Sequence, residues 1–87
     1  LRASTEPYAL LMARTIRERL GTTWGISETG ASGPTGNRYG DAAGHACVAL
    51  SGPTERSITI ETGKPDRVGN MRAFAAAALA LLGEELR

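Results

Sequence analysis

The chain is organised around the segment Ser27-Glu28-Thr29-Gly30-Ala31-Ser32-Gly33-Pro34-Thr35-Gly36-Asn37. Its three glycines recur at every third position, with hydroxyl side chains and a proline between them. Glycine allows backbone conformations that other residues avoid and lets the main chain approach a ligand closely. Consecutive backbone N–H groups in such a turn form a concave nest that suits phosphate or carboxylate. The residues alone leave a ligand-contacting loop and a plain structural loop equally open.

Strand-like residues lead into this segment. Trp24–Glu28 is predicted to be a short buried strand, and residues 29–44 are predicted to be a long loop because they include five glycines. Loops longer than about 12–15 residues in compact domains are usually functional or disordered. The loop lacks the Gly-Lys-Ser/Thr of a Walker A motif, and a strand follows it rather than the helix of a dinucleotide fingerprint. Trp24–Ile26 has no adjacent parallel partner in the sequence, which indicates a missing neighbouring strand.

Two amphipathic helices are predicted to flank the strands. The first is expected over about residues 5–20, with Ser4 or Thr5 as its N-cap. Its apolar stripe, expected to face the core, comprises Tyr8, Leu11, Met12, Ile16 and Leu20. The second is expected over about residues 67–86, with Asp66 as its cap. Its apolar stripe comprises Met71, Ala75, Ala78, Leu79 and Leu82.

Two further strands follow the glycine-rich segment. His45–Leu50 and Arg56–Thr62 are separated by turn residues and predict an antiparallel hairpin. In the first, one face comprises Ala46, Val48 and Leu50. In the second, Ile58 and Ile60 are expected to point inward, and the expected outward set is Ser57, Thr59 and Glu61. The predicted order is therefore α-β-β-β-α, an α/β chain whose small sheet is hard to bury in isolation.

Composition excludes several classes of protein. A chain of 87 residues forms at most one small domain, and a single cysteine excludes an internal disulfide. The sequence lacks a cluster of His and Cys that would indicate a metal site, and we expect no cofactor. Ten basic and nine acidic residues are scattered, so nucleic acid is not an expected partner. The longest apolar run, residues 73–82, is too short for a membrane span of about 20 residues. No signal peptide is visible, and we expect a cytoplasmic location. Because the chain starts with Leu1 and helix-start residues appear within five positions, we expect a fragment or a processed chain.

Few groups suit covalent catalysis. Ser27 and Ser32 would need an adjacent base, and the only histidine and the only lysine lie in other elements. His45 opens a strand with no carboxylate near it in the sequence, so it is expected to be structural. Cys47 is expected to be a small buried side chain. A complete nucleophile–base pair within this chain is therefore not expected.

Three polar residues near the loop are better candidates for ligand contact. Glu28, at the loop entry, would repel an anion unless Arg38 or Arg67 pairs with it. Arg67 opens a helix, where a cation opposes the helix dipole, and a residue placed against local preference is a functional hint. Thr29 leaves substrate contact and a local hydrogen bond to the backbone both open.

At this loop the chain resembles the C-terminal domain of CinA and its stand-alone relatives, the nicotinamide-nucleotide amidohydrolases. Thr29–Asn37 resembles the family element Ser/Thr-Gly-Ile-Ala-Gly-Pro-x-Gly-Gly. Gly44–Ala49 resembles the Gly-x-Val strand that follows it, and Pro65–Arg67 resembles the Gly-Asp-Arg at the start of the last helix. The resemblance spans nearly the whole chain.

This resemblance implies that residues 1–87 are the C-terminal half of a single three-layer α/β/α CinA-like domain. It implies hydrolysis of the carboxamide of nicotinamide mononucleotide to the acid and ammonia, with the proposed nucleophilic serine and activating lysine in the N-terminal half. That half, on a separate or missing chain, and a nucleotide-like small molecule are the implied partners, and a homo-oligomer is expected. The implied catalytic residues are Thr29 and Arg67; the implied substrate-binding residues are Glu28, Gly30, Ala31, Ser32, Gly33, Gly36 and Asn37.

Two other functions stay open. Asp41-Ala42 stands where the family has Lys-Pro, and Asn37 stands where it has a second glycine. These departures favour a CinA-like binding or interaction protein that has lost catalysis. The glycine nest by itself favours a third function, a small nucleotide-binding module without hydrolysis.

Overall fold

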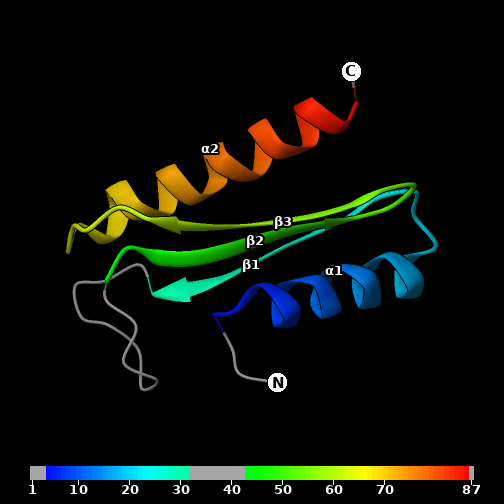
Figure 1. Ribbon diagram of the computed structural model, residues 1–87, viewed down its shortest axis with the longest axis horizontal. Coiled ribbons are helices and arrows are strands. Elements are labelled where there is room, and N and C mark those ends of the chain that lie inside the picture. The colour runs from blue at the N-terminus through cyan, green and yellow to red at the C-terminus, as the bar shows by residue number, and fades with distance from the viewer. Residues whose placement is uncertain (1–3, 32–42, 87) are drawn as a thin grey trace.

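The computed structural model describes residues 4–31 and 43–86, which form three layers in the order α-β-β-β-α. Figure 1 shows the sheet between the two helices, with α1 on one face and α2 on the other. The elements are helix α1 (Glu6–Leu20), strands β1 (Gly25–Ala31), β2 (His45–Ser51) and β3 (Glu55–Glu61), and helix α2 (Arg67–Glu85). The predicted α/β class and order of elements are confirmed.

The sheet has the strand order β1-β2-β3, and both neighbouring pairs are antiparallel. The predicted hairpin of β2 and β3 is confirmed. The prediction that β1 is buried and ends at Glu28 is wrong, because β1 continues to Ala31 and Ile26 is 39% exposed. An edge strand has a neighbour on one side only, and here that neighbour is antiparallel. Residues 29–31 therefore belong to the β1–β2 ladder, although the sequence assigned them to the loop.

The central strand β2 is buried on both faces. The residues predicted to share one face, Ala46, Val48 and Leu50, are all buried, and Val48 and Leu50 join Leu81 in the core beneath α2. On the opposite face Cys47 and Ala49 pack against α1. The expected burial of Cys47 is confirmed.

Helix α1 has the predicted bounds to within one residue, but its predicted core stripe is wrong. The buried residues of α1 are Ala9 and Ala13, and the exposed members of the stripe are Leu11, Met12, Ile16 and Leu20. Small side chains let α1 lie very close to β1. A Cβ atom added at Gly25 would collide with the backbone oxygen of Ala13. Close helix–sheet contact, rather than large apolar side chains, thus sets the buried face of α1.

The polar face of β3 is covered by the first turn of α1. Ser57 and Thr59 each donate a hydroxyl hydrogen bond of 2.6 Å to the carboxylate of Glu6. The prediction that this face points outward is therefore wrong for Ser57, which is half-buried. Ile58 and Ile60 pack on the α2 core as predicted.

Helix α2 begins at Arg67 as predicted. Asp66 is its N-cap, also as predicted, and its carboxylate accepts a hydrogen bond of 3.2 Å from the N–H of Gly69. The predicted core stripe of α2 is confirmed only for Ala78 and Leu82, which pack against the core. The buried residues are Asn70, Phe74 and Leu81, while Met71 and Leu79 are 53% and 69% exposed. Apolar residues surround much of this alanine-rich helix, so its periodicity identifies the buried face poorly. Within the described residues, no helix has both the length and the hydropathy needed to cross a bilayer.

Candidate functional site

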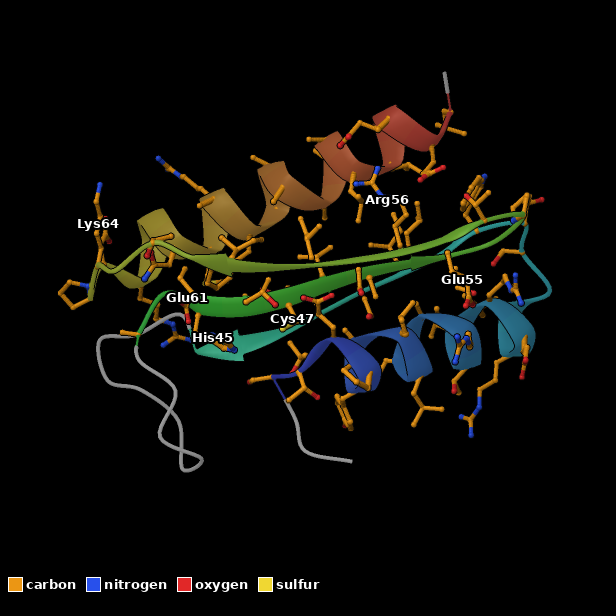
Figure 2. The ribbon with its side chains drawn as sticks, in the orientation of Figure 1. His45, Cys47, Glu55, Arg56, Glu61 and Lys64 are labelled. Carbon is orange, nitrogen blue, oxygen red and sulfur yellow. The ribbon has the colours of Figure 1, made fainter. Side chains whose placement is uncertain are left out.

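One end of the molecule brings together the segments that the sequence singles out. Strand β1 ends at Ala31, opposite His45, the first residue of β2. His45 in turn pairs with Glu61, the last residue of β3, a few residues before Arg67 opens α2. Figure 2 shows His45 and Glu61 side by side at this end, with Lys64 beyond them. Elements distant in sequence therefore share one rim of the sheet.

Ser4 connects this rim to the N-terminal segment. It is 4% exposed and has a φ of 59°, in the left-handed region that residues other than glycine seldom adopt. Its N–H donates to Oγ1 of Thr29 at 3.2 Å. Its carbonyl accepts from Nε2 of His45 at 2.8 Å and from Sγ of Cys47 at 3.4 Å. The start of α1 is thus fastened to both β1 and β2.

His45 has a carboxylate beside it, contrary to the expectation from sequence. Its Nδ1 lies 2.8 Å from Oε1 of Glu61, while its Nε2 faces the carbonyl of Ser4. A carbonyl oxygen only accepts, so Nε2 of His45 carries a hydrogen and donates it to Ser4. The signal for this pair lay in the hairpin, because the register places the two residues opposite each other. We interpret His45 as a structural residue, as expected.

The alternation of β1 separates the predicted site residues onto two faces. Thr29 lies on the α1 face together with Ser27, whose hydroxyl donates to the carbonyl of Ala9. Glu28 lies on the other face, against α2. Arg67 is exposed at the start of α2. The structure therefore brings Thr29 to Ser4 and not to Arg67, and the catalytic roles of Thr29 and Arg67 stay predictions.

Glu28 borders a groove of about 270 Å³ between β1 and α2. The rest of its lining is the apolar side of the helix, formed by Met71, Phe74, Ala75 and Ala78. Within residues 4–31 and 43–86, no ion pair joins Glu28 to Arg67, and the alternative partner Arg38 lies outside the described residues. A carboxylate at the mouth of an apolar groove suits a ligand with an apolar body and an N–H donor.

Gly30 and Ala31 are the last two residues of β1. A Cβ atom at Gly30 would collide with the carbonyl of His45 and with the side chain of Ala46, so the closeness of β1 to β2 requires glycine there. This requirement is structural and holds with or without a ligand. The remaining predicted contacts, Ser32, Gly33, Gly36 and Asn37, lie outside the described residues.

Asn70 is a buried residue of this rim that the sequence analysis missed. Its Nδ2 donates to the carbonyl of Lys64 at 2.7 Å, and its Oδ1 accepts from the hydroxyl of Thr62 at 2.5 Å. The N–H of Thr62 donates to the carbonyl of Gly44, so Asn70 fixes the start of α2 beside the start of β2. Among the described residues no group of three His, Cys, Asp or Glu could hold a metal ion.

Comparisons with known proteins agree with this architecture. Residues 2–86 match the family model of the CinA C-terminal domain. The CinA-like protein of Salinibacter ruber is 40% identical over 77 residues, which cover 88% of this chain and 19% of that protein. The CinA-like protein of Gloeobacter violaceus is 38% identical over 86 residues, which cover 97% of this chain and 20% of that protein.

A crystal structure of a CinA superfamily protein from Enterobacter cloacae superposes with a TM-score of 0.89 at 26% identity. The match covers 97% of this chain and 50% of that one. The chain therefore spans about a fifth of the length of these two curated relatives and half of the solved chain. Sequence and fold give the same answer: the chain belongs to the CinA C-terminal domain family.

Proposed function

We propose that this chain is the C-terminal half of a nicotinamide-nucleotide amidohydrolase domain. The observation that supports the proposal best is the position of Glu28, which borders an apolar groove on the strand that enters the family's glycine-rich segment. A carboxamide offers N–H donors to such a carboxylate, and an aromatic ring suits the apolar wall.

In this proposal the chain binds and orients the substrate, and the complementary half of the domain supplies the serine and the lysine. The serine oxygen attacks the amide carbon, the carbon–nitrogen bond breaks, and the lysine passes the serine proton to the departing ammonia. Water then hydrolyses the ester and releases the acid nucleotide. Glycine-rich backbone N–H groups beyond Ala31 and the guanidinium of Arg67 would hold the phosphate. A homo-oligomer and a cytoplasmic location belong to the same proposal.

Release of ammonia from nicotinamide mononucleotide by the domain assembled from this chain and its complementary half tests the proposal. We expect turnover, with Glu28→Gln raising KM and Glu84→Gln, at the far end of α2, leaving KM unchanged. Absence of ammonia with the assembled domain would contradict the hydrolase function.

A second function is favoured by one specific feature, the presence of Asp41-Ala42 where the family has Lys-Pro. It is a CinA-like binding protein without catalysis. Calorimetric binding of nicotinamide mononucleotide by the assembled domain, with no ammonia released over hours, would favour this function over hydrolysis.

A further inference from the structure

The outer side of helix α2, which faces away from the sheet, is apolar and uncovered. Figure 1 shows no other described element on this side of the helix. Val68, Leu79 and Leu86 are 60%, 69% and 63% exposed. They lie on one side of the helix because the intervals between them are close to whole numbers of helical turns. Ala76, also exposed, lies between them on the same side.

Only one side of α2 is covered in the structure. The sheet covers the side that carries the buried residues Asn70, Phe74 and Leu81. On the rest of the helix, the one exposed charged residue within residues 68–83 is Arg72. A helix that is apolar on all sides is typical of a buried position, and contiguous exposed apolar surface marks sites of association. The outer side of α2 therefore has the composition of an interface.

The charges of α2 indicate what covers this side. Both basic residues of the helix, Arg67 and Arg72, lie in its first two turns, and both acidic residues, Glu84 and Glu85, lie in its last turn. This order opposes the helix dipole, which favours anions at the N-terminus and cations at the C-terminus. Within the described residues no ion pair is found for Arg72, and the side chain of Glu84 is 53% exposed. A neighbouring helix of the same sequence, running antiparallel, would bring an acidic end to Arg72 and a basic end to Glu84.

We infer that the outer side of α2 binds the same surface of a second copy of this chain, with the two α2 helices antiparallel. In such an isologous pair each contact occurs twice about a two-fold axis. Placing Ala76 level with Leu79 of the second copy packs a large side chain over a small one. The same register brings Arg72 within one residue of Glu84, and Val68 within one residue of Leu86. This pairing rests on the homo-oligomer of the proposed function, whose surface it specifies, and not on amide hydrolysis.

Sedimentation equilibrium of the 87-residue chain tests this inference. We expect a dimer whose Kd rises at least tenfold in Leu79→Glu, because a carboxylate would then lie among the apolar side chains of the interface. Leu20→Glu is the matched control, since Leu20 is 67% exposed at the end of α1, on the other face of the sheet. It should change Kd less than twofold. Circular dichroism shows whether each variant keeps the secondary structure of the parent chain, and Leu79→Ala, with an expected rise of threefold or more, replaces a variant that unfolds.

An exchange of charges tests the antiparallel arrangement. Arg72→Glu and Glu84→Arg should each raise Kd at least threefold, because each brings like charges together. The double variant should return Kd to within twofold of the parent value. Arg72 and Glu84 are about 18 Å apart along one helix, so recovery requires a contact between copies. Arg19→Glu, at an exposed position of α1, makes the same change of charge and should leave Kd within twofold of the parent value.

Several outcomes would overturn the inference: a monomer at every concentration, equal losses for Leu79→Glu and Leu20→Glu, or no recovery in the double variant. Loss of the complementary half from the Leu79→Glu chain would assign the surface to that half and would also overturn it. A dimeric assembled domain that releases no ammonia contradicts the hydrolase proposal alone. A monomeric assembled domain that releases ammonia contradicts this inference alone.

Discussion

Arg14 on α1 and Glu55 on β3 form a two-point ion pair. Nε and Nη2 of Arg14 lie 2.7 Å and 2.5 Å from the two carboxylate oxygens of Glu55. The hydroxyl of Ser51 donates a further bond of 2.6 Å to Glu55. Parallel hydrogen bonds between guanidinium and carboxylate are among the stronger polar contacts in proteins. They hold α1 against β3 and leave the other side of the helix facing the β1 edge.

Acid should loosen this contact in a defined range of pH. Hydrogen bonds from Arg14 and then from Ser51 lower the pKa of Glu55 from 4.5 to about 2. A depressed pKa in the folded state gives stability that is present above the unfolded value and is lost as the pH falls through the folded value. We therefore expect the free energy of unfolding, measured with urea, to fall between pH 4.5 and about 2. Glu55→Gln should reduce this slope and Glu18→Gln should retain it; identical slopes for both would contradict the assignment.

Gly25 allows α1 to approach β1, so Gly25→Ala should destabilise the fold. The added methyl group meets the carbonyl of Ala13, and overpacking of this kind costs about 1–3 kcal/mol. Gly83→Ala is the control, because nothing lies within 4 Å of a Cβ atom there and alanine favours a helix by up to about 1 kcal/mol. Unfolding in urea measures the free energy of unfolding of both variants. A Gly25→Ala protein as stable as the parent would refute the close contact.

Asp66 stabilises the first turn of α2. Asp66→Ala removes the hydrogen bond to Gly69 and should lower the free energy of unfolding by about 0.5–2 kcal/mol. Asp66→Ser keeps a capping oxygen and should retain most of that stability. Thermal melts followed by circular dichroism at 222 nm distinguish them. Equal melting temperatures for the Ala and Ser variants would show that the cap is not stabilising.

His45 is expected to hold the N-terminal segment through the carbonyl of Ser4. His45→Ala removes the hydrogen bond that Nε2 donates to the buried carbonyl of Ser4, at a cost of roughly 1–3 kcal/mol. It should also speed hydrogen exchange of the Ser4 amide, which donates to Thr29. Lys64→Ala, at an exposed position of the same rim, should change stability by less than about 0.5 kcal/mol. Equal exchange at Ser4 in both variants would contradict the role of His45.

The elements were predictable from sequence because their signals are local. The cap at Asp66 and the alternation around Ile58 and Ile60 identify α2 and β3 within a few residues. Strand β1 was predicted too short, because Gly30 suggests a loop when the sequence is considered alone. In the fold, Gly30 instead permits β1 to lie close to β2, and this closeness is a tertiary contact.

The buried faces of the helices were not predictable in the same way. The stripe containing Met12 is apolar as the sequence shows, yet it is not the buried face of α1. Of the stripe containing Met71, only Ala78 and Leu82 pack against the core. The periodicity of a helix sequence shows which side of the helix is apolar, but it does not show which element of the fold packs on that side. The pair Thr62–Asn70 depends on the placement of α2, which no local pattern encodes. The pair His45–Glu61 follows instead from the register of the predicted hairpin.

Hydrogen exchange on the assembled half-domains tests most directly the proposal that this chain is half of a single domain, in which the neighbouring strand that the sequence predicts to be missing pairs with β1. In an antiparallel ladder every second residue of an edge strand points its N–H away from its neighbour. We predict that these amides of β1 gain at least tenfold protection when the complementary half binds, while the outward amides of β3 remain unchanged. Protection of the β3 edge, with β1 still exchanging freely, would contradict the account.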